Sequence, residues 1–149
     1  MYYWLMLIFV IAVDQSSKWW VSSTFSSGES QALIDGVLWL TYVQNQGAAF
    51  SILQGKVLFF IIASVIVIAA LMIWAAFYRP PARLAVILGL MSGGAAGNLI
   101  DRLRLSHVID FFDLHWWPIF NVADIAIVIG GILLFLYVLI QERSEQLNG

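Results

Sequence analysis

The feature that most constrains this chain is a set of three long apolar runs, at residues 57–78, 82–100 and 120–140. A helix needs about 20 apolar residues to cross a hydrocarbon core of about 30 Å, and each run is close to that length. The composition agrees, since 62% of the 149 residues are hydrophobic and 11% are charged, far from the average of soluble domains. The sequence therefore predicts an α-helical membrane protein.

A fourth run, residues 3–21, is also long enough to span the membrane but contains Asp14 and Lys18. Its first half resembles the apolar core of a secretory signal, yet no basic segment precedes it and no small-x-small cleavage site follows. We therefore expect a retained first helix and four transmembrane helices in total, with both chain ends on one side of the membrane.

The segments between the predicted spans place two loops on the opposite side, residues 22–56 and 101–119. Residues 37–44 are rich in β-branched and aromatic side chains, which predicts a small strand element resting on the membrane surface. No internal repeat is evident. The chain is thus predicted to be one integral membrane domain, residues 1–149.

Several kinds of chemistry are disfavoured. The absence of cysteine excludes disulfides, thiolate metal sites and a cysteine nucleophile. The seven Lys and Arg residues are scattered singly, so we expect no nucleic-acid partner. His107 and His115 lie near Asp110 and Asp113, but two histidines in a loop are more often polar surface than metal ligands.

Two polar residues interrupt the first span. Asp14 and Lys18 lie four residues apart, so on a helix they share a face and can form an ion pair. The simplest interpretation is a neutralised pair at the interfacial end of the span, where a long basic side chain extends toward water. A role in a functional site is the alternative.

Three glycines, Gly89, Gly93 and Gly97, lie four residues apart in the third apolar run. Such a stripe of small residues is typical of closely packed helices in membranes. Just beyond it, Asn98 and Arg102 share a helix face. An amide and a guanidinium in this position can orient a carboxylate or a peptide carbonyl.

The segment "PIFNVADI" places Asn121 and Asp124 where a helix begins. Asn121 as N-cap and Asp124 at the third helical position predict a capping box, which is a complete structural explanation for both residues. It leaves the upstream carboxylates unexplained. Two aspartates in a partly desolvated site can share a proton and hydrolyse a peptide bond, but spacing does not choose between Asp101 and Asp110 as the partner of Asp124.

Five blocks in this order resemble lipoprotein signal peptidase, also called signal peptidase II: "DQSSK" at 14–18, "NQGAAFS" at 45–51, "GNLIDR" at 97–102, "VIDF" at 108–111 and "FNVAD" at 120–124. The resemblance implies an aspartic endopeptidase of the bacterial cytoplasmic (inner) membrane with its active site at the outer face. It would remove signal peptides from diacylglyceryl-modified prolipoproteins by cleaving before the lipidated cysteine. No metal or organic cofactor is implied.

The resemblance also implies roles for particular residues. The catalytic pair falls on Asp110 and Asp124, and Asp113 has no counterpart, so we interpret it as solvated. The residues expected to bind substrate or support the site are Asn45, Asn98, Arg102, Asn121, Asp14 and Lys18.

Further expectations concern how the substrate binds. The β element and the stretch from Gly47 to Phe50 are expected to cradle the substrate outside the bilayer, with Phe50, Trp116 and Trp117 in contact with lipid. The two tryptophans belong to a loop flap at the lipid headgroups. We also expect the signal helix to lie against the glycine stripe, and the enzyme to act as a monomer among membrane lipids.

Two other functions remain open from the residues alone. The first is a small proton-coupled membrane carrier that uses the same carboxylates as a relay. The second is a structural membrane protein with capped and paired helices. The absence of a repeat or of a broken helix pair disfavours the carrier.

Overall fold

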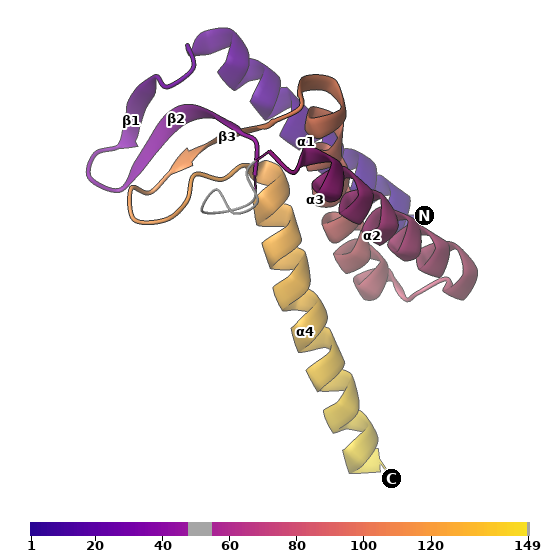
Figure 1. Ribbon diagram of the computed structural model, residues 1–149. Helices are drawn as coiled ribbons and strands as arrows, with labels where there is room; N and C mark the ends of the chain where they lie inside the picture. The colour runs from indigo at the N-terminus through magenta and orange to yellow at the C-terminus, as the bar shows by residue number, and fades with distance from the viewer. Residues whose placement is uncertain (48–54, 149) are drawn as a thin grey trace.

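The computed structural model describes residues 1–47 and 55–148, which form four helices and a small sheet (Figure 1). The elements in chain order are α1 (Tyr2–Thr24), β1 (Ser30–Ile34), β2 (Leu38–Asn45), α2 (Val57–Tyr78), α3 (Ala82–Leu105), β3 (Val108–Asp113) and α4 (Val122–Asn148).

Three helices are long and apolar enough to cross a membrane: α2, α3 and residues Val122–Arg143 of α4. This confirms the prediction of a helical membrane protein. Within the described part of the chain, α1 does not meet the same criterion. The cause lies in its sequence, because Asp14 to Lys18 is a polar stretch of five residues in the second half of the helix.

Two predicted limits of the apolar runs differ from the ends of the observed helices. Helix α3 continues to Leu105, so Asp101 and Arg102 belong to a helix and the prediction of a loop from residue 101 is wrong there. Helix α4 begins at Val122 instead of residue 120. Hydropathy marks how far apolar side chains continue, whereas helix ends depend on hydrogen bonding at the caps.

Helix α1 runs parallel to α3 and packs against its glycine stripe. A Cβ atom on Gly89 would lie 2.7 Å from the carbonyl oxygen of Tyr3, and one on Gly93 would lie 2.7 Å from the Cβ of Val10. Both distances are shorter than carbon atoms tolerate, so these glycines permit close helix packing, as predicted. The expectation that a signal helix lies against this stripe is wrong, because α1 already occupies it.

Helix α4 packs on another side of α3 with its N-terminal part, and Figure 1 shows its C-terminal half extending away from the other helices. Gly94 of α3 faces Ala123 in the first turn of α4, and Gly130 of α4 faces Met91. Helix α2 contacts α3, but none of residues Val57–Tyr78 is buried. The first turn of α4 is therefore held firmly against α3.

The three strands form one antiparallel sheet in the order β1-β2-β3 at one end of the helices (Figure 1). Strand β2 confirms the strand predicted at residues 37–44, while β3 lies inside the segment predicted as a loop. An apolar cluster joins the sheet to the end of α1, and it comprises Val21, Phe25, Tyr42, Ile109 and Phe111. The sheet therefore places β3 beside α1 and α3.

Candidate active site

Asp110 and Asp124, the two residues expected to form the catalytic pair, line one cavity of about 250 Å³. Asp110 lies on β3 and is 3% exposed, while Asp124 lies in the first turn of α4 and is half-buried. Asn45, Asn98 and Arg102 line the same cavity. The structure thus brings together residues from β2, α3, β3 and α4.

Each carboxylate oxygen of Asp110 accepts a hydrogen bond from an amide. Asn45 Nδ2 donates to Oδ2 over 2.8 Å, and Asn121 Nδ2 donates to Oδ1 over 2.6 Å. Asn45 pairs with Val108 across the two strands, so its side chain lies diagonally beside Asp110 on the same face of the sheet. This register explains why a residue of β2 reaches the carboxylate.

The environment of Asp110 favours its protonated form. Burial, with a smaller contribution from the negative charge of Asp124, raises the pKa of Asp110 from 3.8 to about 7. The hydrogen bonds from Asn45 and Asn121 act against this rise. A carboxyl group with a pKa near 7 can accept or release a proton at neutral pH.

Asp124 forms the predicted capping box with Asn121. The backbone N–H of Asn121 donates to Asp124 Oδ2 over 3.1 Å, and the backbone N–H of Asp124 donates to Asn121 Oδ1 over 3.0 Å. The other carboxylate oxygen, Oδ1, accepts a hydrogen bond of 2.8 Å from Asn98 Nδ2. Asn121 therefore caps α4 with its oxygen while its nitrogen binds Asp110.

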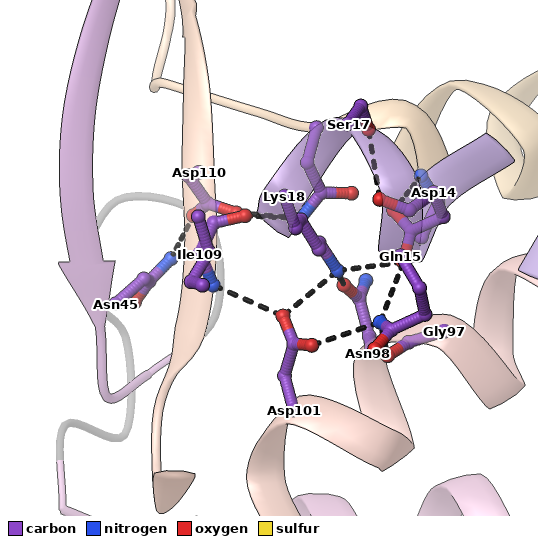
Figure 2. Close-up of polar contacts among 12 residues, drawn as sticks. Asp14, Gln15, Ser17, Lys18, Asn45, Gly97, Asn98, Asp101, Ile109 and Asp110 are labelled. Carbon is purple, nitrogen blue, oxygen red and sulfur yellow. Dashed lines mark hydrogen bonds and ion pairs between the residues drawn. The ribbon is translucent and has the colours of Figure 1, made fainter. Parts of the chain in front are cut away.

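Lys18 lies at the centre of a buried polar cluster behind the cavity (Figure 2). Its Nζ atom is 2.9 Å from Asp14 Oδ2 and 2.9 Å from Asp101 Oδ2, and it donates to Asn98 Oδ1 over 2.9 Å. The predicted pairing with Asp14 is confirmed. The expectation that Lys18 extends toward water is wrong, because Lys18 is 2% exposed and Asp14 is fully buried.

The structure distinguishes Asp101 from Asp110 as the partner of Asp124, which spacing in the sequence alone did not do. Asp101 accepts hydrogen bonds from Gln15 Nε2 over 2.9 Å and from the backbone N–H of Ile109 over 3.1 Å, besides its ion pair with Lys18. It is not among the described residues that line the cavity. Asp101 therefore supports the cluster, whereas Asp110 faces the space in which a substrate can bind.

Comparison with known proteins places these features in a family. The family model described as signal peptidase (SPase) II matches residues 6–140. This chain belongs to the signal peptidase II family. Family membership indicates a protease that removes signal peptides, and it does not favour the carrier.

Relatives match the signal peptidase II chain along almost its whole length. The lipoprotein signal peptidase of Syntrophomonas wolfei is 48% identical and covers 99% of both chains, and that of Halothermothrix orenii is 44% identical over 94% of this chain and 97% of its own. A bacterial membrane enzyme solved by the in meso method at 2.3 Å resolution has a TM-score of 0.89 at 34% identity, covering 94% of this chain and 88% of the other.

Several residues contribute to the site of this signal peptidase II chain although the sequence analysis did not predict them as site residues. Gln15 donates hydrogen bonds to Asp14, to Asp101 and to the carbonyl of Gly97. Phe60 of α2 lies under the Arg102 guanidinium, 4.9 Å from carbon to ring centre. For Asp101, the sequence contained one indication of a role at the site, because Asp101 lies three residues after Asn98 on the same helix face. Nothing local indicated Phe60.

The expectation that Asp113 is solvated is wrong. Asp113 is 9% exposed and accepts hydrogen bonds from Thr41 Oγ1 over 2.9 Å and from the backbone N–H of His115 over 2.7 Å. These contacts join the end of β3 to β2 and to the following turn. Among the described residues, no group of three His, Cys, Asp or Glu side chains is arranged to hold a metal ion.

The residues expected to contact lipid are only partly described. Trp116 is 74% exposed and Trp117 is 52% exposed, and both line an apolar groove of about 390 Å³ that reaches Asp124 along α4. Gly47 lines the cavity that contains Asp110 and Asp124. Phe50, and with it most of the stretch from Gly47 to Phe50, lies outside the described residues.

Proposed function

We propose that this chain is an aspartic endopeptidase whose catalytic pair is Asp110 and Asp124. Its substrates are diacylglyceryl-modified prolipoproteins, which it cleaves before the lipidated cysteine. The observation that carries the proposal is the meeting of two carboxylates from separate elements in one cavity, each oriented by amide donors. The names of the relatives, all lipoprotein signal peptidases, support the substrate class.

The pair acts as acid and base on one water molecule. Two carboxylates that face one cavity do not both ionise easily, and burial and the negative charge of Asp124 favour the protonated form of Asp110. The ionised aspartate removes a proton from water as the water attacks the scissile carbonyl, while the protonated one donates to the carbonyl oxygen. A proton then passes to the leaving amine. The pKa of Asp110, about 7, suits both directions of transfer.

The other polar residues around the catalytic pair have two roles. The side-chain nitrogens of Asn45, Asn98 and Asn121 donate to the two aspartates, so these amides orient the catalytic pair. Arg102 lines the cavity and is supported by Phe60. A guanidinium offers five N–H donors, and we assign Arg102 to a carbonyl of the substrate backbone.

The proposal includes α1 as a fourth membrane span. Helix α1 contacts Gly89, Gly93 and Gly97, which extend over more than two turns of α3. Both helices therefore lie at the same depth in the proposed membrane. The side of α1 that faces away from α3 exposes apolar side chains, including Ile8 and Phe9. Four spans put both termini on one side and the sheet and site on the other. We place the site at the outer face of the bacterial cytoplasmic membrane.

The remaining features follow from this placement. We propose that residues 1–149 act as one domain and as a monomer. The apolar groove beside Trp116 and Trp117 lies next to Asp124, and it suits the lipid chains of the substrate. Replacing both tryptophans with Ala should weaken capture of the lipidated substrate, seen as a higher KM, more than it lowers thermal stability. An unchanged KM would contradict the flap.

The test is cleavage of a diacylglyceryl-modified prolipoprotein by detergent-purified protein, followed by gel shift. Wild type is compared with Asp110→Asn, Asp124→Asn and Asp101→Asn. We expect no cleavage by the first two variants and reduced cleavage by the third. An active Asp110→Asn variant would show that the pair is wrongly assigned, and folded wild type that does not cleave would refute the proposed activity.

A chelator provides a second test of the same mechanism. Because two carboxylates suffice to activate water, EDTA should leave cleavage by the purified enzyme unchanged. Loss of activity that is restored by added metal would contradict the aspartic mechanism.

A further inference from the structure

The three hydrogen-bond donors of Lys18 are all used inside the protein. Its ammonium contacts Asp14 Oδ2, Asp101 Oδ2 and Asn98 Oδ1, each at 2.9 Å (Figure 2). An ammonium has three N–H donors and no acceptor. With one partner for each donor and 2% exposure, Lys18 has a single defined position.

Each partner of Lys18 makes a second contact next to a catalytic aspartate. Asp14 Oδ1 accepts the backbone N–H of Ala123, the residue before Asp124, over 2.9 Å. Asp101 Oδ2 accepts the backbone N–H of Ile109, the residue before Asp110, over 3.1 Å.

The third partner reaches an aspartate side chain directly. Asn98 Nδ2 donates to Asp124 Oδ1 over 2.8 Å. Because Lys18 can only donate, Asn98 must turn its oxygen toward the ammonium, which leaves the nitrogen for Asp124. Asn121 Nδ2, which also donates to Asn98 Oδ1, favours the same orientation.

We propose that Lys18 is a positioning residue that sets the separation and orientation of Asp110 and Asp124 through Asp14, Asp101 and Asn98. The inference rests on the proposed catalytic pair and adds a residue that need not touch the substrate. One ammonium holds α3, β3 and the first turn of α4 at a common point. Placement matters because misplacing reacting groups by about 1 Å can reduce a rate about 100-fold.

The pH dependence of the rate distinguishes a positioning role of Lys18 from a purely structural one. If Lys18 only stabilised the fold, its removal would not shift the pH–rate midpoints. Among the described residues, the charged groups around the pair are Asp14 and Lys18 on α1 and Asp101 and Arg102 on α3, besides the two aspartates themselves. The positive charge of Lys18 lowers the pKa of Asp110. Removing this charge should therefore move the pH–rate midpoints up, and removing the negative charge of Asp101 should move them down.

The experiment measures kcat, KM and the pH–rate midpoints for Lys18→Met and Asp101→Asn on the diacylglyceryl-modified prolipoprotein. For Lys18→Met we expect kcat to fall about 100-fold, with KM changed little and the midpoints shifted to higher pH. For Asp101→Asn we expect a smaller fall in kcat and a shift to lower pH. The control is Gly89→Ala, which disturbs α1–α3 packing at the far end of the helix pair. It should lower the thermal midpoint and leave the pH–rate midpoints unchanged.

Either of two results would overturn the inference. The first is a folded Lys18→Met variant with wild-type kcat and wild-type midpoints. If Lys18→Met does not fold, Asp101→Asn decides, because Asn has the same size as Asp, and wild-type values in that variant would be the second result. Failure of the catalytic assignment is distinguishable, since it shows as activity in Asp110→Asn or Asp124→Asn.

Discussion

Two regions of the molecule differ in how much of their surface is buried inside the protein. One is the end of the helix bundle at which the site lies, and the other is helix α2. The polar cluster at the site is formed where α1, α3, β3 and α4 meet. Of the residues in the apolar stretch of α3, 56% are buried inside the protein. In α2, none of residues Val57–Tyr78 is buried, although its hydropathy is the highest of the three apolar helices. The most hydrophobic helix is therefore the one that contributes least to the protein core.

This difference follows from the solvent. Lipid is as apolar as a protein core, so a helix of large apolar side chains gains little by packing, and small residues provide the close contacts that hold membrane helices together. Helix α3 has small residues on two sides, which face α1 and α4. Every buried side-chain nitrogen and oxygen of the described residues has a hydrogen-bond partner. The polar groups between these closely packed helices are thus buried without being left unsatisfied.

The largest effect that would sharpen this comparison is expected at Asn121. Asn121→Ala removes a donor to Asp110 and the cap of α4. Loss of one oriented donor should lower kcat about 100-fold to 1000-fold, and loss of the cap should reduce the free energy of unfolding by about 1 kcal/mol. Kinetics and thermal unfolding measure the two effects. Asn121→Ser is the matched control, because its hydroxyl oxygen can still cap α4 but it has no amide donor for Asp110, so it should lose activity with a smaller loss of stability than Asn121→Ala. Wild-type kcat in Asn121→Ala would contradict the role of this amide.

The pH dependence of stability tests the cost of burying Asp110. With a pKa of about 7 in the folded protein and 3.8 as its ordinary value, Asp110 binds more protons in the folded state between these limits. The free energy of unfolding of wild type should therefore fall as pH rises from about 4 to 7.

A neutral side chain at this position removes that dependence. Asp110→Asn should gain stability relative to wild type between pH 4 and 7 and then level off, as measured by thermal unfolding in detergent. Asp35→Asn, on the exposed turn between β1 and β2, is the control and should show no such gain. A constant difference between Asp110→Asn and wild type would mean that Asp110 titrates as in water.

A moderate effect is expected at the glycine stripe. The added methyl group of Gly93→Ala would lie 2.7 Å from Val10 Cβ and 2.9 Å from the carbonyl oxygen of Leu7. Overpacking of this kind should lower the free energy of unfolding by about 1–3 kcal/mol. Gly131→Ala on α4 is the control, since its methyl group meets no atom within 4 Å. Equal stability of the two variants in thermal unfolding would show that α1 does not pack against α3 as described.

The smallest effect is expected on α2. Ile66 is 62% exposed, so in the membrane it faces lipid. Ile66→Val should change the free energy of unfolding by less than about 0.5 kcal/mol, and it should leave kcat unchanged. A loss above 1 kcal/mol in thermal unfolding would break the comparison, because it would mean that α2 packs on an unrecognised surface.

Local sequence patterns predicted the features that depend on neighbouring residues. The apolar run at 57–78 coincides with α2, and the capping box at Asn121 and Asp124 and the pairing of Asp14 with Lys18 are present in the structure. Each involves residues within four positions of one another, or a length that the bilayer sets. Ordered blocks across the chain also identified the family, which the comparisons confirm.

The tertiary structure decided how polar residues that are distant in sequence meet. Asp101 and Asp110 are alike in spacing, but α3 continues to Leu105, so Asp101 turns toward Lys18 while β3 places Asp110 at the cavity. Asp113 is buried because β3 pairs with β2, a contact between segments about 70 residues apart. Hydropathy and spacing depend on near neighbours, whereas the partner of a buried charge depends on how helices and strands pack. The sequence by itself thus determined a helical membrane protein of this family and, through the family resemblance, the expected pair Asp110 and Asp124, whereas only packing showed why Asp110 and not Asp101 lines the cavity.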